Sequence, residues 1–456
     1  MRRKLLIGLT MAVILGAKAE IIRSEGIAYQ TDSNYPEECH VTYMSDNIYS
    51  GEMVIPESIN YNGITYTVTG VGEYAFAGCD QLTSVSLPAT LKTVGRNAFQ
   101  GCSSLPSISL PSGVMAIEEQ TFYGCDKLSQ VAASGATEIG KGAFSNCISL
   151  SEISLGKLSY IGDSGFKGCQ SLTGFTMDAG IDLGEGVFQG CSGMESVVLP
   201  VDLKYLPPYT FSGCVKLKEI NTENIVEIGE YAFYTCSSLT DVTFNSSLTF
   251  IGKNAFGLCS ALSVTSIAGK SLMIDDYAFT GCGNLTSIAM TGVTEIGSEC
   301  FSNAYGLSSV KLGSDMKSIG RSAFRNCSGI MYVECQAEIP PFLQNNSFEK
   351  DVYDKAYLYV GSANWLIYAQ TPPWNLFRKI EDVEVESVAA EGEEMEVSQS
   401  PMGLSVSGPN GILRIFTMMG EKIFEGVKET DGMEIPLGFH GVCIVTLENK
   451  CKKIAI

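Results

Sequence analysis

One hydrophobic phrase recurs along the chain between Val71 and Cys335. In its fullest form it is an Ile or Val followed by Gly, then Ala-Phe, then Gly-Cys, and then a Leu that begins a β-type run, often closed by Pro. Consecutive copies are 22 or 23 residues apart, and a period of about 20 to 29 residues around such a leucine core is typical of a leucine-rich solenoid. The twelve copies are marked by Phe76, Phe99, Phe122, Phe144, Phe166, Phe188, Phe211, Phe233, Phe256, Phe279, Phe301 and Phe324.

The alternation inside one copy predicts a single strand with one side in the core. In the first copy we expect Leu82, Val85 and Leu87 to point inward, and Ser84 and Ser86 to point outward. One copy has too little apolar surface to form a core alone, so the copies must stack, with their strands in one parallel sheet. The Ala-Phe-x-Gly-Cys segment is too short for a full helix, so we expect a turn of α- or 3-10 helix on the opposite face. Its Gly suits a tight bend before the Cys.

Composition and charge narrow the classes of partner. The 456 residues are 45% hydrophobic, which is enough for a folded protein with a long continuous core. Thirty Lys and Arg against 50 Asp and Glu give a net charge of -20, which argues against nucleic acid and against an anionic membrane surface. The two histidines, His40 and His440, leave little material for a His-based metal site or general base.

The first residues predict a signal peptide. A basic cluster at residues 2–4 precedes an apolar run at 5–15 and a small-x-small cleavage signal at 17–19, so we expect cleavage before Glu20. The apolar run is about half the length of a transmembrane helix, and no second run of spanning length follows. We therefore expect the mature chain to be exported without a transmembrane helix, and to be secreted or located at the cell surface or outer membrane.

The cysteines recur at one position of the repeat. Eleven of the 16 occupy it, and Ala304 replaces the Cys in the eleventh repeat. A small apolar residue can fill a buried position but cannot act as a thiol or metal ligand, so we predict a column of buried free thiols. Disulfides between adjacent coils are the alternative. Zinc is disfavoured because structural sites use closely spaced Cys pairs. So many free thiols in an exported protein indicate a reducing or anaerobic habitat.

After the repeats the composition changes. Half of the residues from Glu381 to Glu396 are acidic, which predicts a solvated linker. Calcium binding is the alternative for this segment. Three β-type runs, at residues 404–406, 412–416 and 442–445, then predict a small all-β sandwich.

One His/Cys group in this tail is a candidate zinc site. His440, Cys443 and Cys451 are close in sequence. A hairpin centred near Asn449 would pair Cys451 with Leu447 and Cys443 with Ala455. The two sulfurs would then share a face but lie two same-face residue pairs apart, too far for a disulfide bridge. No metal site and no cofactor are predicted.

The repeat units Ile-Gly-x-x-Ala-Phe-x-Gly-Cys-x-x-Leu resemble the BspA-type leucine-rich repeats of bacterial surface proteins. Residues 49–68 look like that family's N-terminal cap, and residues 357–377 look like its C-terminal cap. The resemblance implies a secreted or cell-surface protein that binds other molecules, such as host proteins or other bacteria. The expected domains are a signal peptide (1–19), an N-terminal cap (20–70), twelve repeats (71–335), a C-terminal cap (336–380), an acidic linker (381–402) and a β domain (403–456).

The tail resembles a second family. Residues 403–456 look like the C-terminal sorting domains of Bacteroidetes proteins exported by type IX secretion. The run Ile435-Pro436-Leu437, then Gly441-Val442 and Lys452-Lys453, follows that family's order. The sequence departs from the pattern at Cys443, where a Tyr is usual. Similar tails also occur as accessory β domains, so this resemblance leaves two roles open.

Outward positions of the predicted sheet are the candidate binding surface. They are mostly Ser and Thr, which solvated strands tolerate well, but which together offer many hydrogen-bonding groups on a rigid scaffold. Glu219 and Asp241 are expected side by side on neighbouring strands, which is costly unless a cation or partner group compensates. Aromatic anchors are not expected on this face. The candidates on this concave face are Ser84, Ser107, Ser151, Thr173, Thr176, Glu195, Ser196, Lys218, Glu219, Thr240, Asp241, Thr243, Ser287 and Ser309.

Catalytic motifs are missing from the sequence. No Gly-x-Ser-x-Gly elbow, phosphate loop or His-Glu-x-x-His occurs. A hydrolase using Glu195, Glu219 and Asp241 is one alternative, and a passive surface coat or spacer with no specific ligand is another. We predict a leucine-rich repeat solenoid with a small C-terminal all-β sandwich. Its predicted function is adhesin-like binding of an extracellular protein or glycan, from the host matrix or other bacteria, with no enzyme activity.

Overall fold

The computed structural model describes residues 19–43, 49–361 and 364–383, and the tail residues 396–400, 403–407, 411–417, 422–429, 433–435, 442–447 and 450–455. Almost all of the predicted signal peptide and most of the predicted acidic linker lie outside these residues. The chain divides into two compact units, which are described separately. The first comprises residues 1–173 and 180–194, and the second comprises residues 174–179 and 195–456.

The first unit begins with a mixed β-sheet. Its strands follow the order β1-β2-β3-β6-β5, in which β3 and β6 are parallel and the other pairs are antiparallel. Tyr49 closes the core at this end, because its ring lies 5.0 Å from the ring of Phe76. The strands are β1 (Ile21–Ser24), β2 (Ile27–Thr31), β3 (Glu38–Val41), β5 (Ser58–Tyr61) and β6 (Ile64–Val71).

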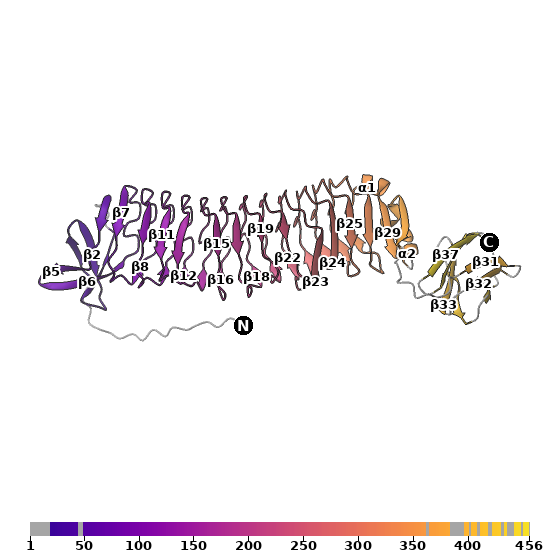
Figure 1. Cartoon of the computed structure of the whole chain (residues 1–456), viewed down its shortest axis with the longest axis horizontal. Helices are drawn as coiled ribbons and strands as arrows, with labels where there is room; N and C mark the ends of the chain where they lie inside the picture. Colours follow the sequence, from indigo (N-terminus) through magenta and orange to yellow (C-terminus); the bar gives the residue numbers. More distant parts are fainter. Residues whose placement is uncertain are drawn as a thin grey trace. The chain divides into compact units, whose positions relative to one another are not determined.

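Each coil contributes two parallel strands rather than the one predicted (Figure 1). We name the strand that follows the repeat leucine the leucine strand, and the two-residue strand that precedes the repeat glycine the glycine strand. In the first unit the leucine strands are β7 (Leu82–Ser86), β9 (Ser107–Ser109), β11 (Gln130–Ala133) and β13 (Glu152–Leu155), and β4 (Gly51–Val54) pairs in parallel with β7. The glycine strands are β8 (Thr93–Val94), β10 (Ala116–Ile117), β12 (Glu138–Ile139), β14 (Tyr160–Ile161) and β16 (Asp182–Leu183).

The second unit has strands at the same two positions of its coils. Its long strands β23 (Ser266–Ile274) and β24 (Ser287–Ile296) run through both of them, so β24 pairs with a leucine strand and then with a glycine strand. The leucine strands are β15 (Gly174–Thr176), β17 (Ser196–Val198), β19 (Glu219–Ile220), β21 (Asp241–Val242), β25 (Ser309–Leu312), β27 (Tyr332–Cys335) and β29 (Tyr357–Gly361). The glycine strands are β18 (Tyr205–Leu206), β20 (Glu227–Ile228), β22 (Phe250–Ile251), β26 (Ser318–Ile319) and β28 (Phe342–Leu343).

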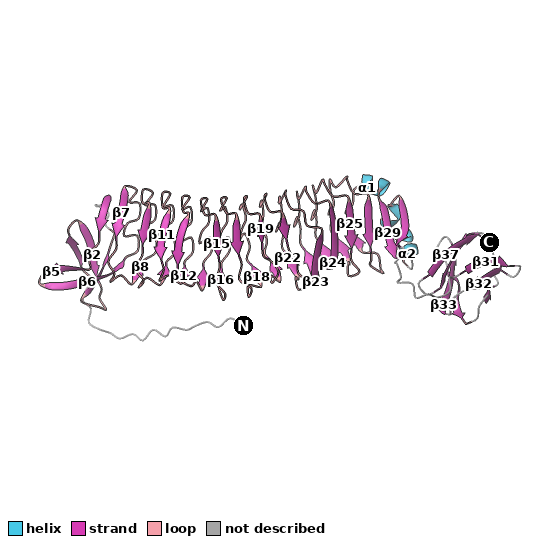
Figure 2. Cartoon of the chain, in the orientation of Figure 1, coloured by secondary structure: helices cyan, strands magenta, loops and turns pink. Residues whose placement is uncertain are grey.

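Helix is confined, among the described residues, to the end of these coils (Figure 2). The indole Nε1 of the buried Trp374 donates a hydrogen bond to the carbonyl oxygen of Pro341, 2.8 Å away. Trp374 also contacts the ring of Phe348, which lies against the last repeat phenylalanine, Phe324. These aromatic residues therefore cover the end of the core. The elements are α1 (Lys350–Lys355), α2 (Trp365–Gln370), the 3-10 helix η1 (Trp374–Leu376) and the strand β30 (Lys379–Val383).

The segment around each repeat phenylalanine forms turns instead of the predicted helical turn. In every repeat the residues two before and two after the Phe have positive φ, as at Tyr74 (+57°) and Gly78 (+74°). The N–H of Phe76 donates to Ala98 O in the next coil, at 2.7 Å, whereas the N–H of Ala77 donates to Tyr74 O in its own coil. A helix would direct every N–H to its own coil. The predicted Gly before the Cys is therefore explained by its left-handed conformation.

A ladder of phenylalanine rings and cysteine thiols fills the core of each unit. Neighbouring rings lie nearly parallel, as for Phe76 and Phe99, with centroids 5.0 Å apart and planes 8° apart. Nine of the repeat thiols donate to a carbonyl oxygen of the preceding coil, as from Cys102 Sγ to Phe76 O at 3.1 Å. The described cysteines from Cys39 to Cys335 are buried and free, and Ala304 is fully buried as well. The predicted column of buried free thiols is confirmed.

The tail residues of the second unit form two antiparallel sheets, as the prediction of an all-β fold requires. One sheet has the order β31-β32-β35 and the other β34-β33-β36-β37. Val406 and Ile435 of the first sheet and Leu413 and Ile415 of the second are buried. The strands are β31 (Glu396–Ser400), β32 (Gly403–Ser407), β33 (Gly411–Thr417), β34 (Lys422–Lys428), β35 (Met433–Ile435), β36 (Val442–Leu447) and β37 (Lys450–Ala455).

The predicted register of the last hairpin is wrong by one residue. Cys451 pairs with Thr446 rather than Leu447, and Cys443 pairs with Ile454 rather than Ala455. The reason is that Leu447 pairs with Lys450 directly, so the loop holds two residues instead of a single central one. Cys443 and Cys451 are consequently three residue pairs apart along the ladder. The third member of the group weighed as a metal site, His440, lies outside the described residues.

Candidate functional site

The exposed face of the leucine strands is the candidate binding surface. The two residues after the repeat leucine are exposed in several coils, as at Thr83 and Ser84 after Leu82. The second of these two positions begins the row that we name the first row. In the first unit this row runs in register through Ser107, Gln130 and Glu152. The second row, two residues further along each strand, runs through Ser109, Ala132 and Ser154. Neighbouring strands lie about 4.8 Å apart, so each row is a regular line of side chains.

The structure places the predicted site residues in three positions of this face. Ser84, Ser107, Ser196, Glu219 and Asp241 lie in the first row, and Thr176 and Thr243 lie in the second; all are exposed. Ser287 and Ser309 lie in the first row and are half-buried. Ser151, Thr173, Glu195, Lys218 and Thr240 lie just before the first row, at what we name the preceding position, and are exposed.

Hydroxyl groups at the preceding position join neighbouring coils. Ser151 Oγ donates to Ser129 O at 3.3 Å, and Thr240 Oγ1 donates to Lys218 O at 3.2 Å. Ser263 Oγ donates in the same way to Thr240 O at 3.1 Å. For Ser151 and Thr240 a structural role therefore accounts for the hydroxyl, and this leaves the two rows as the better candidates for contact with a partner.

The predicted pair of acidic residues is confirmed by the strand register. Glu219 of β19 lies directly beside Asp241 of β21, with Ser196 of β17 on the other side of Glu219. At the preceding position Lys218 Nζ is paired with Glu195 Oε2 at 3.1 Å, and both side chains are largely exposed. Such an exposed ion pair contributes about 0–1 kcal/mol to stability. The adjacent carboxylates make the part of this face on β19 and β21 favourable for a cationic or hydrogen-bond-donating group.

Aromatic residues do occur on this face, contrary to the prediction. Tyr332 of β27 pairs in register with Ser309 and with Tyr357 of β29, so it continues the first row. Tyr359 continues the second row beside Glu334. The centroids of the three tyrosine rings lie 6.2–6.5 Å apart, with planes 20–28° apart. The repeat phrase stops at Cys335, but the sheet continues into β29. The alternation of tyrosine and aliphatic residues in Tyr357–Val360 was the sequence signal that could have predicted these aromatic residues on the face.

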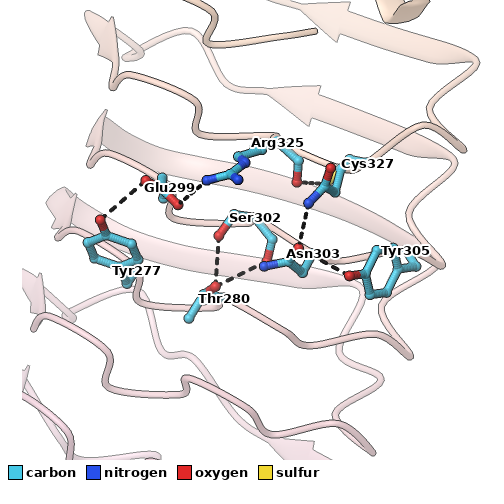
Figure 3. A network of polar contacts seen from close by, with 9 residues as sticks. Tyr277, Thr280, Glu299, Ser302, Asn303, Tyr305, Arg325 and Cys327 are labelled. Atoms are coloured by element: carbon cyan, nitrogen blue, oxygen red, sulfur yellow. Dashed lines mark hydrogen bonds and ion pairs between the residues drawn. The ribbon is translucent and has the colours of Figure 1, made fainter.

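The edge formed by the phenylalanine turns carries a second polar surface (Figure 3). Glu299 accepts a hydrogen bond from the Tyr277 hydroxyl of one neighbouring coil, at 3.2 Å, and pairs with Arg325 of the other, at 3.4 Å. These side chains hold successive coils together, so we assign this edge a structural role. Figure 3 also draws Thr280, Ser302, Asn303, Tyr305 and Cys327 from the same network.

The described residues show neither a metal cluster nor a membrane span. No group of three or more His, Cys, Asp and Glu side chains among them is arranged to hold a metal ion. No helix in the described part of the chain is both long and apolar enough to cross a bilayer. Burial raises the pKa of the core thiols, to about 12 for Cys125 and Cys282, so these cysteines are poor nucleophiles at neutral pH.

Comparisons with known proteins agree with this architecture. The family model described as "BspA type Leucine rich repeat region (6 copies)" matches residues 56–173, 128–226, 160–271 and 221–331. A leucine-rich repeat protein from Bacteroides ovatus is 23% identical, with a TM-score of 0.51, over 82% of this chain and 100% of that chain. The pneumococcal vaccine antigen PcpA is 18% identical, with a TM-score of 0.50, over 76% of this chain and 94% of that chain. At these identities the likeness shows the fold. No curated protein gives a significant match.

Proposed function

Since this chain belongs to the BspA-type leucine-rich repeat family, we propose that it is an exported, adhesin-like protein. It binds an extracellular protein or glycan through the exposed face of its leucine strands, and it has no enzyme activity. The observation that carries this proposal is the pair of regular rows on that face, where hydroxyl and carboxylate groups are held in register on a rigid core. The basic and apolar segments at residues 2–15 support export.

The part of the face on β17, β19 and β21 is where we expect a protein partner to bind. Ser196, Glu219 and Asp241 lie side by side, and Val198 is 52% exposed in the row beside them. An exposed apolar side chain among polar groups resembles the composition of protein interfaces, which combine an apolar centre with a polar rim. Many copies on one cell would raise the effective affinity of a modest single contact.

The test is a binding screen of the mature chain against extracellular-matrix proteins and glycans. We expect a saturable partner whose binding is lost when Asp241→Lys and Thr243→Lys are introduced together, because two cations replace a carboxylate and a hydroxyl on the face. Glu227→Lys is the matched control, since Glu227 is also exposed but begins a glycine strand. Loss of binding in the control as well, or no binding to anything, contradicts the proposal and favours a passive surface coat.

We propose in addition that residues 403–456 direct the protein to the cell surface. The resemblance to type IX sorting domains supports this role, as does the core that the two tail sheets provide for themselves through Val406, Leu413, Ile415 and Ile435. A separate core allows such a domain to be recognised independently of the repeats.

A further inference from the structure

We propose that the aromatic end of the leucine-strand face binds a neutral saccharide, with Tyr332 as the stacking residue. Lys311 and Glu334 would supply hydrogen bonds to the ligand's hydroxyl groups. The inference rests on the surface-binding role proposed above, and it names the ligand class for one end of that surface.

The first step is the exposure of the aromatic rings. Tyr332, Tyr357 and Tyr359 lie with their rings within 28° of parallel, so they form one continuous aromatic surface. Tyr332 remains 50% exposed although it is flanked by a strand on each side. An aromatic ring held in place by its neighbours binds with little loss of conformational entropy, which is why Tyr is enriched at binding hot spots.

The second step is the set of short side chains beside Tyr332, namely Ser309, Ser287 and Ala289, which we name the floor. Ser309 is its partner in the first row, and Ser287 follows on the next strand. Ala289 occupies the second row next to Lys311. These three side chains are too short to cover the side of Tyr332 that faces away from Tyr357. Strands are spaced about 4.8 Å apart, close to the width of one sugar ring, so this floor has room for a sugar unit beside the tyrosine.

The third step is the polar group that borders the floor. Lys311 Nζ and Glu334 Oε1 are 2.9 Å apart, with exposed fractions of 44% and 25%. Gln336 Nε2 donates to the same Oε1 at 2.9 Å and so fixes the carboxylate. An ammonium group has three donors and a carboxylate about four acceptor sites, which is more than these two contacts use. The group therefore offers both donors and acceptors to a ligand.

The balance of charge selects the ligand class. Lys311 and Glu334 neutralise each other, so this end of the face favours an uncharged ligand over an ionic one. A sugar ring combines an apolar face, which suits the tyrosine, with hydroxyl groups that both donate and accept. A protein partner binds mainly through a few side chains that fill well-packed pockets, and the floor here consists of hydroxyl and methyl groups on an open sheet. The observations therefore favour a neutral saccharide.

Isothermal titration of the mature chain with maltohexaose, cellohexaose, mannohexaose, xylohexaose and chitohexaose tests the proposal. We expect at least one to bind saturably, and Tyr332→Ala to weaken that binding at least tenfold. Tyr332→Trp should preserve it, which shows that a ring is what matters, and Lys311→Met should weaken it severalfold. The control Tyr305→Ala removes a tyrosine that is 66% exposed on the turn edge, and should change nothing.

Three results would overturn the inference: no binding by any of the five saccharides, equal binding by Tyr332→Ala with its fold intact by circular dichroism, or binding only of charged oligogalacturonate. The Asp241→Lys, Thr243→Lys variant separates this inference from the proposed function. A protein partner lost in that variant, together with no saccharide binding, refutes the saccharide site alone. Absence of both kinds of partner refutes both proposals.

Discussion

Cys300 and Ala304 have exchanged the places that Ala and Cys hold in most repeats. Cys300 stands directly before Phe301, where Ala75, for example, stands before Phe76. Both exchanged residues are fully buried, and the backbone of Phe279 lies within hydrogen-bonding reach of the Cys300 thiol. This coil therefore buries one Ala and one Cys, as most coils do, but with the two residues in reversed order around the Phe. This exchange explains how the repeat tolerates the loss of its Cys.

Reverting one half of the exchange should destabilise the protein, and reverting both should not. We expect Cys300→Ala to leave a small cavity and Ala304→Cys to overpack the core, each lowering the free energy of unfolding by about 1–2 kcal/mol. The double variant restores the common order and should recover most of the loss. A double-mutant cycle measured by urea unfolding gives the coupling energy. Additive effects would show that the two positions are independent.

Stability should fall steeply at alkaline pH. Burial raises the pKa of the core thiols from about 9 to about 12 at Cys125, Cys191, Cys282 and Cys327. Below pH 9 both states are protonated and the contribution of these thiols to stability is fully present. Between pH 9 and 12 the unfolded chain loses protons that the folded chain keeps, so the free energy of unfolding falls by about 1.4 kcal/mol per pH unit for each thiol.

Urea unfolding at pH 8.0, 9.0, 9.5 and 10.0 measures this slope. Replacing Cys125 and Cys191 by Ala should make the slope shallower by about 1.4 kcal/mol per pH unit at pH 9, and by nearly twice that at pH 10, where the unfolded thiols are almost fully ionised. Ionisation of the buried tyrosines would be unaffected by that change. A slope that is the same in the variant and the parent would show that the thiols are not its source.

Leu258 occupies a strained position in the phenylalanine turn. Its φ is +62° where most repeats have Gly or Asn, and its side chain is 44% exposed. Leu258→Gly should therefore raise the free energy of unfolding by about 0.5–1 kcal/mol, because glycine adopts this conformation without a steric cost. Gly124→Ala is the matched opposite: φ is +69°, and an added Cβ would meet nothing within 4 Å. It should destabilise by a similar amount, and two changes of the same sign in thermal denaturation would contradict the argument.

Removal of the tail should stop surface display. In a bacterium with type IX secretion, a chain lacking residues 403–456 is expected to accumulate in the periplasm, with its repeats folded. Fractionation and surface labelling with an antibody against the repeats measure this. A second variant, with the tail fused directly to a periplasmic reporter, should carry that reporter to the surface. Normal display of the truncated chain would refute the sorting role.

Much of this architecture can be predicted from the sequence because the core repeats with it. Phe76, Cys79 and Leu82 fix the coil, and the same spacing returns at each later repeat. The glycine strands escaped prediction because two residues, such as Glu138 and Ile139, give too short a pattern to be distinguished from a loop. The prediction of a helical turn was wrong because, in the turn around each phenylalanine, alternate backbone N–H groups donate to carbonyl oxygens of the next coil. The sequence of a single repeat does not reveal these bonds between coils.

The binding face was predicted less completely than the core. Glu219 and Asp241 could be aligned because each follows a repeat leucine by two residues. Ser151 and Thr240 were grouped with the strand residues because only the structure shows their hydroxyls bonded to the preceding coil. Tyr357 and Tyr359 were assigned to the cap, since the strand that carries them follows no repeat phrase.

The alternating hydrogen bonds of the phenylalanine turns have a consequence for how such a chain can change in length. Each coil presents the same donors and acceptors to its neighbours, so a coil removed or inserted as a whole leaves matching surfaces on both sides. We therefore expect the fold to tolerate the insertion or deletion of one whole repeat, 22 or 23 residues, better than a change that breaks this period. Each such event moves the ends of a row by about 4.8 Å, and the reach of the binding face becomes adjustable in equal increments.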